Sequence, residues 1–153
     1  MIFSLAWLAC GTAPDPAEGL VIRLSAFHEV PSYTELATET EALGTTLSRI
    51  AKDGEVSPLV RDRAWQVLAT APDPALAVEG IGDASVPAAT RLKLLMTLAR
   101  HHPKAAGPVA VEHWCHEDAL VRRGARTAFD RLPADQRPTR PSVDACGDLD
   151  PTP

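Results

Sequence analysis

The chain has 153 residues, enough for one domain with a buried core, and 45% of them are hydrophobic, which argues against wholesale disorder. Only 5% are aromatic, and Ala, Leu and Val supply most of the apolar surface, a mixture that favours packed helices over strands. The net charge of −5 excludes a general electrostatic attraction to nucleic acid, although residues 58–132 are weakly basic. We therefore predict an all-α protein.

The first segment, Ile2–Ala9, is apolar and leads into Cys10 and a structure-breaking run at 11–16. Leu8-Ala9-Cys10 resembles the end of a bacterial lipoprotein signal, in which a small residue precedes a cysteine that receives lipid. The resemblance implies a membrane anchor on Cys10 and a location at the bacterial cell envelope, facing the periplasm. It departs from the pattern at Trp7, where an aliphatic residue is usual, and in having no Lys or Arg before the apolar run. The alternative is a cytoplasmic chain whose first helix buries a thiol. Eight apolar residues are too few to span a bilayer.

Helical periodicity and capping residues predict a series of helices along the rest of the chain. Their expected ranges are 16–28, 33–52, 58–70, 74–80, 87–101, 104–114 and 118–132. The expected caps are Asp15, Ser32, Ser57, Asp73, Ser85 and Asp118. Ser32 and Glu35 have the spacing of a capping box. The first helix is interpreted as a leading cap, and the others pair in chain order.

A repeat with a period near thirty residues is the strongest internal signal. Leu59–Leu68 aligns with Leu120–Phe129, and Ala89–Leu98 lies between them. Arginines recur at 61, 91 and 122, and prolines at 72, 103 and 133. The pattern Leu-Val-Arg-x-x-Ala-x-x-x-Leu resembles the second helix of bacterial HEAT-like repeats. The resemblance implies a short α-α superhelix, a HEAT-like solenoid of about three helical hairpins plus an N-terminal cap helix. The domains are then a tether at 1–15, a repeat domain at 16–132 and a tail at 133–153.

The middle copy of the repeat is apolar on nearly every side. The apolar side chains that together run nearly all round the predicted helix are Leu92, Leu94, Leu95, Met96 and Leu98. The flanking copies keep one apolar stripe and one polar face. The middle helix is therefore expected to be enclosed by two neighbours.

Catalytic motifs are absent from the sequence: it has no phosphate-binding Gly-rich loop, serine elbow or Cys-x-x-Cys. One cluster, His101, His102, His113, Cys115 and His116, has residue types that bind metals. Its spacing matches no known ligand pattern, and the two groups would lie at opposite ends of a hairpin. We expect no catalytic site, metal or cofactor.

A solenoid offers a broad surface for a protein partner, which is the function we expect. Stacked second helices would align basic residues in a ridge, and we predict that Arg61, Trp65, Arg91 and Arg122 contact the partner. The resemblance also implies structural pairs between the arginines and acidic loop residues: Asp53 or Glu55, Asp83, and Glu117 or Asp118. A phosphate- or nucleic-acid-binding ridge is the alternative, and we do not expect nucleic acid as the main partner.

The tail is rich in Pro, Asp and Arg and is expected to be mobile unless Cys146 holds it. If Cys10 carries lipid, Cys115 and Cys146 remain as an even pair in an oxidising compartment. The sequence leaves open whether they form a disulfide or stay as thiols.

Overall fold

The computed structural model describes residues 15–26, 29–142 and 146–147. These ranges form eight α-helices and short 3-10 segments and contain no β-strand, so the all-α prediction is confirmed. No helix within them has the length and apolar character needed to cross a bilayer. The helices are α1 (Pro16–Ser25), α2 (Tyr33–Leu36), α3 (Leu43–Lys52), α4 (Pro58–Leu68), α5 (Ala75–Gly82), α6 (Ala88–His101), α7 (Pro103–Glu112) and α8 (Ala119–Arg131), followed by the 3-10 helix η1 (Ala134–Gln136).

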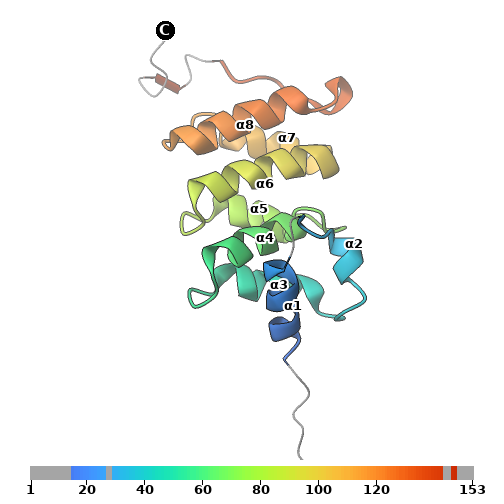
Figure 1. Ribbon diagram of the computed structural model, residues 1–153. Helices are drawn as coiled ribbons and strands as arrows, with labels where there is room; N and C mark the ends of the chain where they lie inside the picture. Colours follow the sequence, from blue (N-terminus) through green and yellow to red (C-terminus); the bar gives the residue numbers. More distant parts are fainter. Residues whose placement is uncertain (1–14, 27–28, 143–145, 148–153) are drawn as a thin grey trace, which may run out of the picture.

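Helices from α3 onward pack in pairs, and the pairs lie one above another (Figure 1). The pairs are α3 with α4, α5 with α6, and α7 with α8. We call α4, α6 and α8 the second helices, because each is the second member of its pair. The second helices contact one another in series, with α6 between α4 and α8. At one end α1 packs on α3 and α4, and at the other η1 packs on α7.

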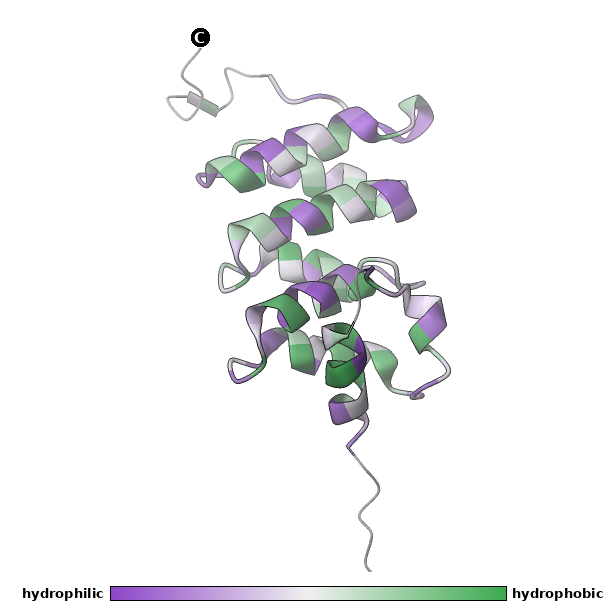
Figure 2. Ribbon diagram, in the orientation of Figure 1, coloured by the Kyte–Doolittle hydropathy of each residue, from purple (hydrophilic) through white to green (hydrophobic). Residues whose placement is uncertain are grey.

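The core runs through all the pairs as one cluster of buried side chains. Leu94, Leu95 and Leu98 of α6 are each 0% exposed, as expected for a helix enclosed by its neighbours. Along the second helices hydrophobic and hydrophilic residues alternate in the ribbon (Figure 2), which is the pattern of helices with one buried and one exposed face. Burial of apolar surface therefore holds the pairs together.

The prediction of one helix over 33–52 is wrong, because the chain breaks between α2 and α3. The hydroxyl of Thr40 accepts a hydrogen bond from the backbone N–H of Ala42, at 3.3 Å. Short hydroxyl side chains compete in this way with helical hydrogen bonds. The break also places Glu39 against α1, where its carboxylate lies 3.1 Å from Nε of Arg23.

Most of the predicted caps are confirmed. The side chains of Asp15, Ser32, Ser57 and Asp118 accept backbone hydrogen bonds at the starts of α1, α2, α4 and α8, and Ser32 and Glu35 complete the capping box. Asp73 accepts from the N–H of Ala75 at the start of α5. Ser85 is the exception: α6 begins after Pro87 with no side-chain cap, and the backbone N–H of Ser85 donates to the carboxylate of Asp83.

Candidate interaction surface

The repeated arginines occupy equivalent places, each in the first two turns of a second helix. Arg122 of α8 donates from Nη1 to the carbonyl oxygens of His116 and Glu117, at 2.6 and 3.2 Å. It therefore bonds to the backbone of the preceding loop, whereas the family resemblance implied a carboxylate partner. This contact with the backbone fixes the loop against the helix, as an ion pair with a loop carboxylate would.

Arg91 of α6 is buried, with 7% of its surface exposed. Its Nη1 lies 3.3 Å from Nε2 of His116, and Nδ1 of His116 faces the N–H of Asp118 at 2.9 Å. The expected pair with Asp83 is absent: the hydrogen bonds that Ser85 donates are the main reason that the pKa of Asp83 is lowered, and Arg91 contributes least. The imidazole of His116 therefore covers Arg91 from the next loop.

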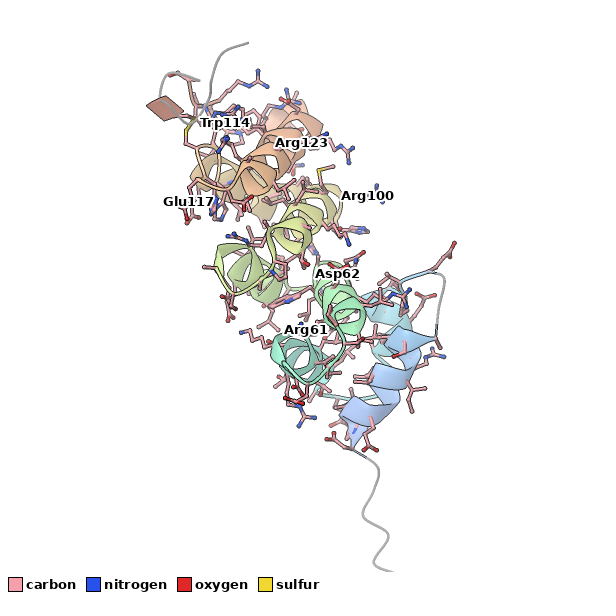
Figure 3. The ribbon with its side chains drawn as sticks, turned by 60° about the vertical axis from the view of Figure 1, so that its left-hand side comes forward. Arg61, Asp62, Arg100, Trp114, Glu117 and Arg123 are labelled. Atoms are coloured by element: carbon pink, nitrogen blue, oxygen red, sulfur yellow. A yellow bond between two sulfur atoms is a disulfide. The ribbon has the colours of Figure 1, made fainter. Side chains whose placement is uncertain are left out.

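Arg61 of α4 differs from the other two because its side chain makes no hydrogen bond or ion pair with any described residue. Asp53 and Glu55, its expected acidic partners, are exposed elsewhere in the preceding loop. Arg61 lines a pocket of about 160 Å³ between α4 and α6, and its Nε is buried in the protein without an acceptor. Figure 3 shows Arg61 beside Asp62 on this side of the molecule.

The predicted ridge is corrected at two of its four positions. Trp65 is only 2% exposed and Arg91 only 7%, so neither presents a face for a partner to contact. Trp65 is buried because it packs against Gly80 of α5, which has no side chain to keep the indole out. Arg61 and Arg122 remain partly exposed.

Asp62 is a connecting residue that the sequence did not reveal. Its carboxylate accepts from Thr90 Oγ1 at 2.8 Å and from Lys93 Nζ at 2.7 Å, both on α6. It also accepts from Nε2 of Gln66, one turn along α4, at 2.8 Å. Asp62 thus joins two second helices through one carboxylate. The only sequence signal is that Asp62 stands where the aligned copies have Leu92 and Arg123.

The exposed side of the second helices carries a row of apolar and basic side chains. Leu59 and Leu120 occupy equivalent repeat positions and are 54% and 44% exposed. Lys93 and Arg123 are exposed on α6 and α8 (Figure 3 labels Arg123). We call Leu59, Lys93, Leu120 and Arg123 the exposed row. Leu59 and Leu120 thus leave large apolar side chains open to solvent at the same position of two repeats.

The histidine cluster is divided by the structure. His101 and His102 line an open pocket with Pro74 and Gln136, whereas His113 and His116 pack together with ring centroids 5.5 Å apart. Within the described ranges no group of three or more His, Cys, Asp or Glu residues has the geometry of a metal site.

Cys115 and Cys146 are joined by a disulfide, with their Cα atoms 4.9 Å apart. The bond holds the tail next to Trp114, where the side chains of Arg126 and Arg140 lie 5.4 and 5.5 Å from the indole centroid. The part of the tail at 133–142 therefore packs on the last helix pair. Cys10, the expected lipid attachment site, lies outside the described residues.

No protein-family model, curated protein or solved structure matches this chain.

Proposed function

We propose that this protein is a non-enzymatic binding module for another protein, built as a HEAT-like α-solenoid. The observation that carries the proposal is the exposed row, because two large apolar side chains, Leu59 and Leu120, recur at the same repeat position on either side of α6. The serial contacts of α4, α6 and α8 support the solenoid, in which each repeat meets only its neighbours.

Three of the basic side chains support this choice over a nucleic-acid-binding ridge. Arg91 is buried, Arg122 is bonded to loop carbonyls, and Nη1 of Arg63 donates to the carbonyl of Leu24 at 2.6 Å. These cations stabilise the fold itself, whereas nucleic acid is held by cations that are available to neutralise phosphates.

We further propose that the protein is a bacterial lipoprotein, anchored through Cys10 and facing the periplasm. The disulfide between Cys115 and Cys146 supports export, because disulfides persist in oxidising compartments and are rare in the cytosol. Its test is radiolabelled palmitate, which should label the wild type and not the Cys10→Ala variant. A wild type without label contradicts the anchor.

Binding is tested with a photo-crosslinking residue placed at Leu59 in cells that make the protein. Leu120→Glu should abolish the cross-linked adduct while leaving the far-UV circular dichroism unchanged, because it places a charge in the exposed row. Ile22→Glu is the matched control: Ile22 is also a large exposed apolar residue, but it lies on α1. An adduct that survives Leu120→Glu contradicts the proposed surface.

A further inference from the structure

One pocket on the side of the second helices has a charge that the protein does not neutralise. Lys52, Arg61, Asp62, Trp65, Ser85 and Pro87 are among the residues that line it. Lys52 is paired with Glu79 at 2.6 Å, and Asp62 is paired with Lys93 at 2.7 Å. Arg61 is left without a counter-charge among the described residues. We call this cavity the Arg61 pocket.

The guanidinium of Arg61 is also short of acceptors. An arginine carries five N–H donors, and those of Arg61 meet no acceptor within the described part of the chain. Its Nε is removed from solvent, so water cannot fully replace the missing bonds. Buried donors are normally satisfied. Nε of Arg91 also has no acceptor, so Arg61 is set apart because its Nη atoms have no partner among the described residues either and because it lines a cavity, where a ligand would bring the acceptor.

In the next repeat the equivalent arginine, Arg91, has a side chain from the following loop beside it. His116 stands six residues before Arg122, and Nε2 of its imidazole lies 3.3 Å from Nη1 of Arg91 on the preceding second helix. The residue six positions before Arg91 is Ser85, whose side chain is too short to cover Arg61 in the same way. The Arg61 pocket therefore occupies the space that the His116 imidazole fills one repeat later.

The pocket suits a monoanion with two acceptor oxygens. A carboxylate matches the guanidinium fork, in which two parallel N–H groups donate to two oxygens. The carboxylate of Asp62 on the same wall would repel a doubly charged phosphate more strongly than a singly charged group. A volume of about 160 Å³ has room for the end of a side chain but not for a larger ligand.

We propose that the Arg61 pocket binds a carboxylate, and that this carboxylate belongs to an acidic side chain of the protein partner. The assignment to a partner rests on the proposed function. Binding of a carboxylate in the pocket does not depend on that function, so carboxylate binding and the identity of the partner are tested separately.

The first experiment measures carboxylate binding to the intact chain. Ac-Glu-NH2 is titrated at constant ionic strength and pH 7 while the Arg Nε–H resonances are followed by NMR, with neutral Ac-Gln-NH2 as the isosteric probe. The Arg61 signal should shift and saturate with a dissociation constant on the order of 1 mM, as expected for so small a ligand. Ac-Gln-NH2 should bind at least about tenfold more weakly, since it lacks the charge. Equal shifts with both probes, no saturable shift, or tighter binding of inorganic phosphate would overturn the proposal.

Variants locate the site. Arg61→Gln removes the cation and should abolish binding, with the Trp65 indole N–H as the reporter. Ser85→His reproduces the arrangement of His116 and Arg91 and should also abolish binding, although Arg61 is still present. Arg100→Gln, at an exposed arginine near the end of α6, should bind as the wild type does. Wild-type affinity in either Arg61→Gln or Ser85→His contradicts the assignment.

The second experiment identifies the source of the carboxylate. Adduct formation from the photo-crosslinker at Leu59 should fall at least about tenfold in Ser85→His and Arg61→Gln and be unchanged in Arg100→Gln, as expected if one desolvated ion pair contributes strongly to binding. Undiminished adduct in the first two variants means that the pocket takes a free small carboxylate, which overturns the partner assignment. A wild type that forms no adduct contradicts the proposed function, while the titration still decides the pocket chemistry.

Discussion

Trp65 and Gly80 form a contact that neither residue predicts alone. From the sequence, Trp65 is among the residues expected to contact a partner, and Gly80 is simply a poor helix former. In the structure a Cβ on Gly80 would lie 2.5 Å from the indole ring, so the absence of a side chain on α5 is what admits the tryptophan. The sequence showed both residues but could not show that they face each other.

Gly80→Ala should destabilise the protein by about 1–3 kcal/mol, because the added methyl group must displace a large buried ring. The loss is expected despite the higher helix propensity of alanine. Gly19→Ala on α1 is the matched control: nothing lies within 4 Å of its added Cβ, so it should stabilise by about 0.5–1 kcal/mol. Urea unfolding measures both. A Gly80→Ala variant as stable as the control would show that the ring has room to move.

His113 should make stability fall as the pH is lowered. Burial holds the pKa of its ring below the ordinary value of 6.5, and the nearby His116 and Arg91 act in the same direction against the carboxylate of Glu112. The unfolded chain therefore binds a proton at His113 at a higher pH than the folded chain does. The contribution of His113 to the free energy of unfolding should be constant above about pH 7. It should decrease as the pH falls from about 6.5 to the lowered pKa that His113 has in the folded protein.

The measurement is urea unfolding between pH 5 and 7.5 for the wild type, His113→Gln and His101→Gln. His113→Gln should have a shallower decline than the wild type, and His101→Gln should follow the wild type because His101 is exposed. Parallel curves for the wild type and His113→Gln would contradict the prediction.

At the two interfaces between second helices, the same two repeat positions are in contact, but different residues occupy them. Asp62 of α4 meets Lys93 of α6, and at the equivalent positions Leu92 of α6 meets Gly124 of α8. A Cβ on Gly124 would lie 3.1 Å from the Leu92 backbone, so α6 and α8 approach closely. The α4–α6 interface instead holds the ion pair of Asp62 and Lys93, and the Arg61 pocket lies at this interface.

Asp62→Ala should weaken the α4–α6 interface by about 1–3 kcal/mol. The loss has two sources: the buried hydroxyl of Thr90 is left without its acceptor, and Lys93 is left without its counter-ion. Asp130→Ala is the matched control, because its ion pair with Arg140 is solvent-exposed on both sides and should contribute at most about 1 kcal/mol. Thermal unfolding compares them, and equal losses would show that Asp62 is no more than a surface charge.

At the level of elements, the sequence predicted the helices better than their interruptions. Proline positions and caps such as Ser57 and Asp118 located the starts of α4 and α8, because these signals act within a few residues. The break between α2 and α3 was missed, since the Glu39–Arg23 contact that accompanies it joins separate parts of the chain. The arginine period was correct, but the partner of each arginine depends on loops that the repeat does not conserve.

Over the whole molecule, the two ends of the helical stack are closed in different ways. At the first end, Arg63 of α4 bonds to the last turn of α1 through the Leu24 carbonyl. At the second end, Pro138 packs on Gly107 of α7, and Arg137 lies 5.8 Å from the ring centroid of Phe129. The composition of 133–153 predicts a mobile tail. A sequence does not show whether an arginine side chain packs on an aromatic ring or is surrounded by water, so these contacts could not be predicted.

Reduction of the disulfide should therefore destabilise the whole protein and not only its tail. The bond between Cys115 and Cys146 closes a loop with a sequence separation of 31, for which loop entropy gives about 3–4 kcal/mol. Without it the tail should leave Trp114 and Phe129, whose edge-to-face contact belongs to the same core as α6 and α8. Urea unfolding of the wild type should show one transition, shifted to lower urea by dithiothreitol. The Cys115→Ala/Cys146→Ala variant should match the reduced wild type and be insensitive to dithiothreitol. A reduced protein with an unchanged transition, its two thiols verified by mass after alkylation, would mean that the arginine contacts alone hold the tail in place.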